Sequence, residues 1–246
     1  MSRQDEIIDY LAQVGFARVG DLAERFGVTM STIRRDLIEL ERVEQIQRTH
    51  GGAFSLGGTD TPGRFEETLH MREKRAIGRA MADRIMDGQT VLLDSGSTTL
   101  EVARNLRAER LTIVTNDLRI GFEVADRKSA HLVFIGGELL PSGYTMWGPA
   151  SIAQVENLRV NVAVFTADAV LKDGVYNTTS YEIELKRKMR AIATEAFLVV
   201  DSSKFHRDAL FKVFGFDACT AAITDNAINP IFAAGFPIPI VRVAPD

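Results

Sequence analysis

Residues 28–53 place arginine and hydroxyl side chains at helical spacing ahead of a glycine pair. With 3.6 residues per turn, Met30, Ile33, Leu37 and Leu40 form one apolar face that is expected to pack inward. The opposite face presents guanidinium groups, which bind phosphates and the edges of guanine bases. The residues expected at this nucleic-acid surface are Thr29, Ser31, Thr32, Arg34, Arg35, Arg42, Arg48, His50 and Gly51.

Three short helices must position this face. Apolar spacing predicts helices over 5–13 and 19–26, and a tight turn at Gly27 leads to a third helix with Thr29 or Ser31 as its N-cap. Arg35 and Ile38 lie on the outward side of that third helix. This is the arrangement of a helix-turn-helix, whose second helix enters the major groove, followed by a wing. The alternative is a small helical cap whose arginines are merely solvated.

Charge favours a local rather than a general DNA surface. Residues 1–56 hold seven Arg, no Lys and nine Asp or Glu, and 7 minus 9 gives a net charge of −2 with His neutral. The whole chain carries −4. DNA affinity is therefore expected to come from one arginine patch, doubled by oligomerisation, with a modest salt dependence.

Length and composition indicate two domains in 246 residues with 46% hydrophobic content. We predict a DNA-binding domain at 1–56, a Gly/Thr/Pro-rich linker at 57–65 and an α/β domain at 66–246. No run approaches the ~20 apolar residues of a membrane span, so a cytoplasmic protein without membrane contact is expected. The lone Cys219 and four scattered histidines suggest neither an intrachain disulfide nor a metal site, and no cofactor is expected.

The second domain is expected to contain a parallel sheet. A helix is predicted over 66–86, followed by near-continuous hydrophobic runs at 91–94, 111–116, 132–137, 162–165 and 197–201. Such strands are buried on both faces, which predicts a Rossmann-like fold with helices on both sides.

Polar residues follow these strands at the ends where an open parallel sheet binds ligands. Backbone N–H groups and hydroxyls at the start of a helix after the first strand would suit a phosphate, although an ordinary strand-to-helix loop has the same composition. The predicted effector-binding residues here are Asp94, Ser95, Gly96, Ser97, Thr98, Thr99, Thr115, Asn116, Gly136 and Gly137.

Three further charged residues could complete this site. Glu182 and Lys186 lie one turn apart on a helix predicted over 181–192, and Lys204 follows a later strand. The loop at 95–99 has no positive charge, so Lys204 is the predicted cation for a phosphate. On spacing alone, Glu182 and Lys186 equally suit a surface pair contributing about 0.3–0.5 kcal/mol.

The segments TIRRDL at 32–37 and HGGA at 50–53 resemble the DeoR family of bacterial transcriptional regulators, and the resemblance extends over nearly the whole chain. It implies a winged helix-turn-helix joined to a sugar-phosphate-sensing domain, whose fold is similar to ribose-5-phosphate isomerase and glucosamine-6-phosphate deaminase. It also implies effector roles for Glu182, Lys186 and Lys204. Glu44 replaces a common glycine before the wing, and Asn161 replaces a usual Asp, with Asp168 one strand-length further on.

Three functions are consistent with these residues. The favoured one is a transcriptional regulator of carbohydrate catabolism, most often a repressor in this family. Its expected partners are double-stranded operator DNA, a phosphorylated sugar or polyol and further copies of itself, as a dimer or tetramer. The second is a sugar-phosphate isomerase or deaminase using Glu182 as general base. The third is a constitutive DNA-binding protein whose α/β domain serves only for assembly.

Overall fold

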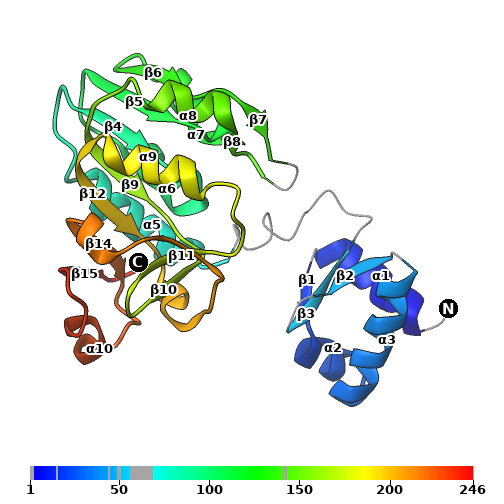
Figure 1. Cartoon of the computed structure of the whole chain (residues 1–246). Helices are drawn as coiled ribbons and strands as arrows, with labels where there is room; N and C mark the ends of the chain where they lie inside the picture. The colour runs from blue at the N-terminus through cyan, green and yellow to red at the C-terminus, as the bar shows by residue number, and fades with distance from the viewer. Residues whose placement is uncertain are drawn as a thin grey trace. The chain divides into compact units, whose positions relative to one another are not determined.

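The computed structural model describes residues 3–14, 16–43, 45–48, 51–55, 69–140 and 143–245. The chain divides into two compact units, at residues 1–69 and 70–246 (Figure 1). His50, Glu44 and the linker predicted at 57–65 lie outside the described residues. The predicted domain boundaries therefore stay a prediction.

The first unit contains the three predicted helices and a small antiparallel sheet in the order β1-β3-β2. The strand at Phe16–Arg18 has only three residues, too few to show an alternation of polar and apolar side chains, and it was not predicted from the sequence. The elements are α1 (Arg3–Val14), β1 (Phe16–Arg18), α2 (Val19–Arg25), α3 (Met30–Arg42), β2 (Ile46–Arg48) and β3 (Gly52–Ser55). This is a winged helix-turn-helix.

The core of the first unit forms where α3 packs against α1 and α2. Ile33, Leu37 and Leu40 are buried as predicted, whereas Met30 is 52% exposed. Met30 was expected in the core, but it is the first residue of α3, and its side chain points back beyond the helix start. Gly27 adopts a φ of +62° between α2 and α3, a conformation that glycine reaches without steric cost.

The second unit is built on a seven-stranded sheet in the order β15-β14-β12-β9-β4-β5-β6, and every neighbouring pair is parallel. Chain order runs outward from β4 through β5 to β6, then returns to β9 on the other side of β4. The pair β4 and β9 is thus the topological switch point of a Rossmann-like sheet. The strands are β4 (Thr90–Leu93), β5 (Leu111–Thr115), β6 (Ala130–Phe134), β9 (Val160–Phe165), β12 (Ala193–Val199), β14 (Ala221–Asp225) and β15 (Ile240–Val243).

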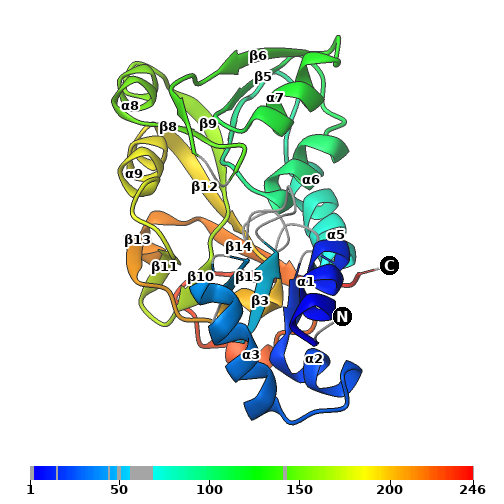
Figure 2. The same ribbon diagram turned by 90° about the vertical axis from the view of Figure 1, so that its right-hand side faces the viewer.

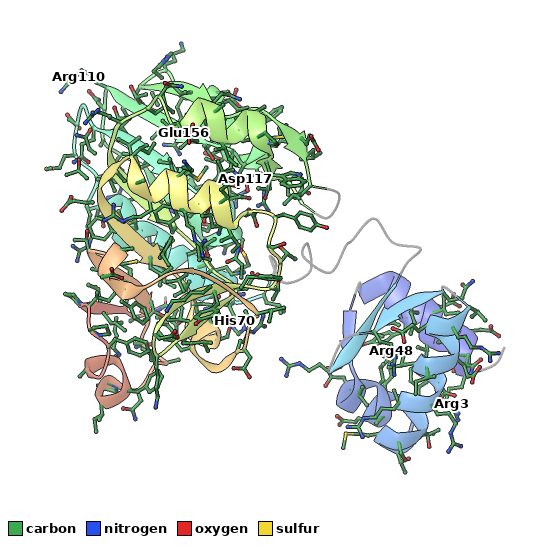
Figure 3. All side chains as sticks on the ribbon, in the orientation of Figure 1. Arg3, Arg48, His70, Arg110, Asp117 and Glu156 are labelled. Carbon is green, nitrogen blue, oxygen red and sulfur yellow. The ribbon has the colours of Figure 1, made fainter. Side chains whose placement is uncertain are left out.

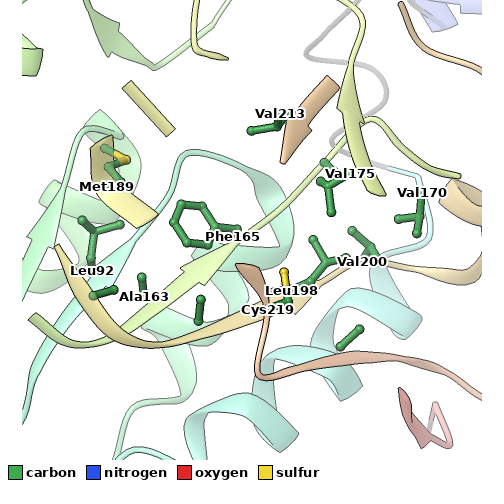
Figure 4. Packing of buried hydrophobic residues seen from close by; sticks show 14 of the residues in the cluster. Leu92, Ala163, Phe165, Val170, Val175, Met189, Leu198, Val200, Val213 and Cys219 are labelled. Carbon is green, nitrogen blue, oxygen red and sulfur yellow. The ribbon is translucent and has the colours of Figure 1, made fainter. Parts of the chain in front are cut away.

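Helices cover both faces of this sheet (Figure 2). On one side lie α5 (Met71–Ala82), α6 (Ser97–Asn105) and α7 (Leu118–Ala125); on the other lie α8 (Pro149–Val155) and α9 (Ile183–Ala191). Side chains alternate between the two resulting cores. Val91 and Leu93 of β4 join the core beneath α5 to α7, and Leu92 joins the opposite one with Phe165 and Met189 (Figure 4). The predicted fold class is confirmed.

The second unit also contains smaller elements that were not predicted from the sequence. The strands among them form one three-stranded antiparallel sheet and one two-stranded antiparallel sheet. They are β10 (Ala169–Leu171), β11 (Gly174–Asn177) and β13 (Phe211–Phe214), then β7 (Glu138–Leu139) with β8 (Met146–Trp147), and also η1 (Ser202–His206), η2 (Phe216–Ala218) and α10 (Pro230–Ala234). Within the described residues, no helix is long and apolar enough to cross a membrane.

Candidate functional site

The start of α3 is fixed by hydroxyl groups. The N–H of Thr32 donates to Thr29 Oγ1 over 3.2 Å, so Thr29 is the N-cap, the first of the two residues considered for that position. The hydroxyls of Ser31 and Thr32 lie 2.7 and 2.9 Å from the same oxygen. All three predicted DNA-binding hydroxyls therefore lie together at the amino end of α3.

The outward face of α3 carries exposed arginines. Arg34 and Arg35 are exposed and form no ion pair with any of the described residues. Arg42 lies 3.7 Å from Glu39 in a solvent-exposed pair, an arrangement that contributes little stability. The guanidinium groups of Arg34 and Arg35 are thus available to an anionic partner.

Arg48 has a different environment from the arginines of α3. Its Nε lies 2.7 Å from Glu41 Oε2, and this hydrogen-bonded pair links β2 to α3 and lowers the pKa of Glu41. Contact of Arg48 with a DNA phosphate would require it to exchange this partner. Gly51 accepts a backbone hydrogen bond from Val19 N–H over 2.9 Å, which ties the wing to α2.

A buried ion pair lies at the switch point of the large sheet. Lys186 Nζ is 2.8 Å from Asp94 Oδ2 and donates to the carbonyl of Thr166 over 3.1 Å. Both charged side chains are at most 4% exposed. Burial alone would lower the pKa of Lys186, but the carboxylates of Asp94 and Glu182 outweigh it and raise that pKa. The surface-pair alternative for Glu182 and Lys186 is therefore wrong.

Asp117 is a second buried centre, which the sequence reasoning missed (Figure 3). Its carboxylate accepts from Ser95 Oγ over 2.8 Å and from the N–H of Gly96 over 3.3 Å. It also pairs with Arg119 at 2.7 Å, and the Arg119 guanidinium lies over the Tyr144 ring at 4.3 Å. As the N-cap of α7, Asp117 carried a recognisable helix-start signal.

The predicted phosphate cradle lies at the amino end of α6. Gly96 precedes the helix, and no described side chain caps it. A Cβ on Gly96 would lie 2.4 Å from Thr166 Cγ2, so the loop after β4 closely approaches the residue after β9. The Thr99 hydroxyl donates to Gly96 O, and both Thr98 and Thr99 are buried. The half-exposed Ser97 and the first-turn N–H groups of α6 remain for a ligand.

The other predicted strand-end residues are held in hydrogen bonds within the protein. Thr115 Oγ1 donates to Leu93 O over 2.8 Å, and Asn116 Nδ2 donates to Met146 O over 2.9 Å. The carbonyl of Gly136 accepts a hydrogen bond from Ser151 Oγ over 2.7 Å, and a Cβ on Gly137 would lie 2.2 Å from Ser151 Oγ. These contacts explain the residue types structurally, so their effector contacts stay predictions.

Glu182 is half-buried just before α9, among several carboxylates. Its burial raises its pKa to about 7; Lys186 opposes that rise, while Asp94, Asp168 and Asp117 contribute to it. A proton on Glu182 is thus exchangeable near neutral pH. Asp94, Glu182 and Asp168 each raise the pKa of Lys186, so three carboxylates lie near this lysine at the carboxyl end of the sheet.

Asp168 and Asn161 lie in different places. Asp168 follows β9, accepts from the N–H and hydroxyl of Thr178 at 2.7 and 2.8 Å, and acts on the pKa of Glu182. Asn161 lies near the start of β9 and accepts a hydrogen bond from the N–H of Thr90, the first residue of β4. Asp94 follows the last residue of that strand, at its other end. Asp168, and not Asn161, belongs to this acidic group.

Lys204 lies on η1, which follows β12 and packs against β10. Its own N–H donates to Asp201 O over 3.1 Å. Asp94 pairs with Lys186, and Asp117 pairs with Arg119. The predicted phosphate contact of Lys204 stays a prediction. No group of three or more metal-ligating side chains occurs in the part of the chain that is described.

Comparison with known proteins gives matches along both units. A family model described as the DeoR C terminal sensor domain matches residues 69–226, and one described as a DeoR-like helix-turn-helix domain matches residues 3–58. A putative aga operon transcriptional repressor from Escherichia coli O157:H7 is 31% identical over 92% of this chain and 86% of its own length. The glycerol-3-phosphate regulon repressor of Escherichia coli strain K12 is 31% identical over 91% of this chain and 90% of its own.

Solved structures give weaker matches. A ribose 5-phosphate isomerase A from Methanocaldococcus jannaschii is similar over 54% of this chain and 53% of its own, with 16% identity and a TM-score of 0.38. A similarity of this size carries no argument about function.

Proposed function

Because the chain belongs to the DeoR family of transcriptional regulators, we propose that it represses carbohydrate catabolism genes and that a phosphorylated sugar or polyol controls its operator binding. One observation carries this proposal. The same chain presents on α3 the exposed Arg34 and Arg35, which form no ion pair with any described residue, and it places a group of buried and half-buried polar residues at the switch point of a parallel sheet. The first suits DNA phosphates and bases, and the second suits a small polar ligand.

The phosphate of the effector is assigned to the amino end of α6. The first N–H groups of a helix lack intrahelical partners and carry partial positive charge, which favours an anion. Ser97 adds a half-exposed hydroxyl there, and Arg119 provides a nearby guanidinium through its contact with Asp117. Lys204 remains the second candidate cation.

The hydroxyl groups of the effector are assigned to the acidic group. Carboxylate oxygens accept hydrogen bonds and a protonated carboxyl can also donate one, so Glu182 and Asp168 suit the hydroxyls of a sugar or polyol. Lys186 neutralises the charge of Asp94, which reduces the repulsion between this acidic group and the anionic phosphate of the ligand. The name of the glycerol-3-phosphate regulon repressor, a relative, agrees with a ligand having a phosphate at one end and hydroxyls at the other.

Operator control is assigned to a homo-oligomer, a dimer or tetramer. Two recognition helices fit two half-sites only at separations of about 34–36 Å or multiples of it, so a ligand that alters subunit packing changes affinity for DNA. The ligand shifts the equilibrium only as far as its affinity differs between the two states.

The test uses the full chain and two variants. A duplex selected from a random-sequence library serves as operator in mobility-shift titrations, and a panel of sugar and polyol phosphates is screened by thermal shift. Arg35→Ala should weaken specific DNA binding by about 1–3 kcal/mol and leave ligand binding unchanged. Ser97→Asp should abolish ligand binding by repulsion and leave DNA binding unchanged. If both variants behave as wild type in both assays, the proposal is wrong.

An enzyme remains the second candidate because Glu182 has a pKa of about 7, which suits a general base. We propose that the chain turns over none of the panel. Isomerisation or deamination by the wild type that is lost in Glu182→Gln would instead establish an enzyme with an appended DNA-binding unit.

A further inference from the structure

Ile38 lies at the centre of the outward face of α3. Its side chain is 48% exposed. At helical spacing it is one turn from Arg34 and Arg35 on one side and from Arg42 on the other. The buried residues Ile33, Leu37 and Leu40 occupy the opposite side, so Ile38 contributes nothing to the core of this unit.

A large apolar side chain amid arginines has a specific use on a DNA-reading helix. Each base pair presents a distinct pattern in the major groove, and thymine alone carries a methyl group there. Arginine cannot read that methyl group, because its guanidinium offers only hydrogen-bond donors. A branched aliphatic side chain can, since burying its methyl groups against the thymine methyl removes apolar surface from water.

We propose that Ile38 reads the C5-methyl group of one thymine in each operator half-site. This inference rests on the proposed function, because it requires α3 to lie in the major groove. One helical turn advances about 5.4 Å and one base pair about 3.4 Å, so this thymine lies within about two base pairs of the base that Arg35 contacts. Ile38 thereby sets a base preference that the arginines cannot set.

The test replaces thymine by deoxyuridine, which keeps base pairing and removes only the methyl group. A duplex selected from a random library by the wild-type chain is synthesised with each thymine replaced in turn. Wild type should lose about four-fold in affinity at one symmetry-related pair of positions, the factor that corresponds to one buried methyl-sized group. Ile38→Ala should bind the thymine duplex at least that much more weakly and lose nothing further at the same positions.

Val43→Ala is the matched control. Val43 is 55% exposed at the C-cap of α3, and helical spacing turns it about 140° away from Ile38. It should bind like wild type and keep the full sensitivity to deoxyuridine. Because Ile38 and Val43 are both exposed, neither change should alter the melting temperature of the chain.

The outcomes separate this inference from the proposed function. If Arg35→Ala weakens binding but Ile38→Ala keeps the deoxyuridine sensitivity of wild type, α3 reads DNA and the role of Ile38 is refuted. The role is likewise refuted if no thymine position is sensitive. If neither Arg35→Ala nor Ile38→Ala weakens specific binding, then α3 is not the reading helix and the proposed function fails with it.

Discussion

Lys186→Met should destabilise the second unit by about 3–5 kcal/mol. The change removes the cation that lies 2.8 Å from Asp94 and the hydrogen bond to Thr166 O, and it leaves a carboxylate that is 0% exposed without its charged partner. At an effective dielectric constant of 20, two unit charges at that distance attract by about 6 kcal/mol, which sets an upper bound. Breaking a buried pair by removing one member typically costs the smaller range.

A second substitution should rescue the stability lost in Lys186→Met. In the double variant Asp94→Asn with Lys186→Met no buried charge is left alone, and the Asn carbonyl can still accept from Thr166 N–H, as Asp94 does over 3.2 Å. Most of the lost stability should return. Lys188→Met is the matched control on the same helix, because its partner Glu156 and Lys188 itself are both solvent-exposed. It should cost less than about 1 kcal/mol.

Urea unfolding followed by tryptophan fluorescence measures these differences. Trp147 is the only tryptophan in the chain, and it lies in β8 of the second unit, so the signal reports that unit alone. A shift of the midpoint at constant slope gives the stability change. A loss under 1 kcal/mol for Lys186→Met, or a double variant as unstable as the single one, would refute the buried-pair argument.

Three further predictions concern other sites. Glu182 has a pKa raised to about 7, so the folded state binds its proton more tightly than the unfolded state does. The free energy of unfolding should therefore fall as the pH rises from about 4.5 to 7. In urea titrations Glu182→Gln should abolish this loss, so the variant should be about 1–2 kcal/mol more stable than wild type at pH 8. Gly78→Ala puts a Cβ 2.6 Å from the Glu101 backbone and should cost about 1–3 kcal/mol of stability. Gly20→Ala has no atom within 4 Å of the new Cβ and should stabilise α2. Thermal melts by circular dichroism distinguish the two variants, and equal shifts in melting temperature would contradict the packing argument. Lys204→Ala should weaken effector binding by about 1.5–3 kcal/mol without loss of operator binding, and superimposable effector titrations with wild type would show that this ammonium is not a ligand.

The sequence predicted those features that depend on neighbours along the chain. The spacing of Ile33, Leu37 and Leu40 identified the buried side of α3, and their burial fixes which arginines face outward. Hydrophobic runs identified five of the seven parallel strands, because strands buried on both faces need no alternation. The parallel strands β14 and β15 were missed. β14 is buried, but its sequence AAITD is not a run of large apolar side chains. β15 and the short antiparallel strands have few residues with mixed exposure, which give no period to recognise.

Tertiary structure decided which side chains meet. The sequence places Lys186 one turn from Glu182, but the fold of β4 beside β9 brings it to Asp94, 92 positions earlier in the chain. Periodicity along the chain fixes the face of an element on which a residue lies, because it follows from local backbone geometry. Partners across a parallel sheet depend on strand order, which only long-range packing selects.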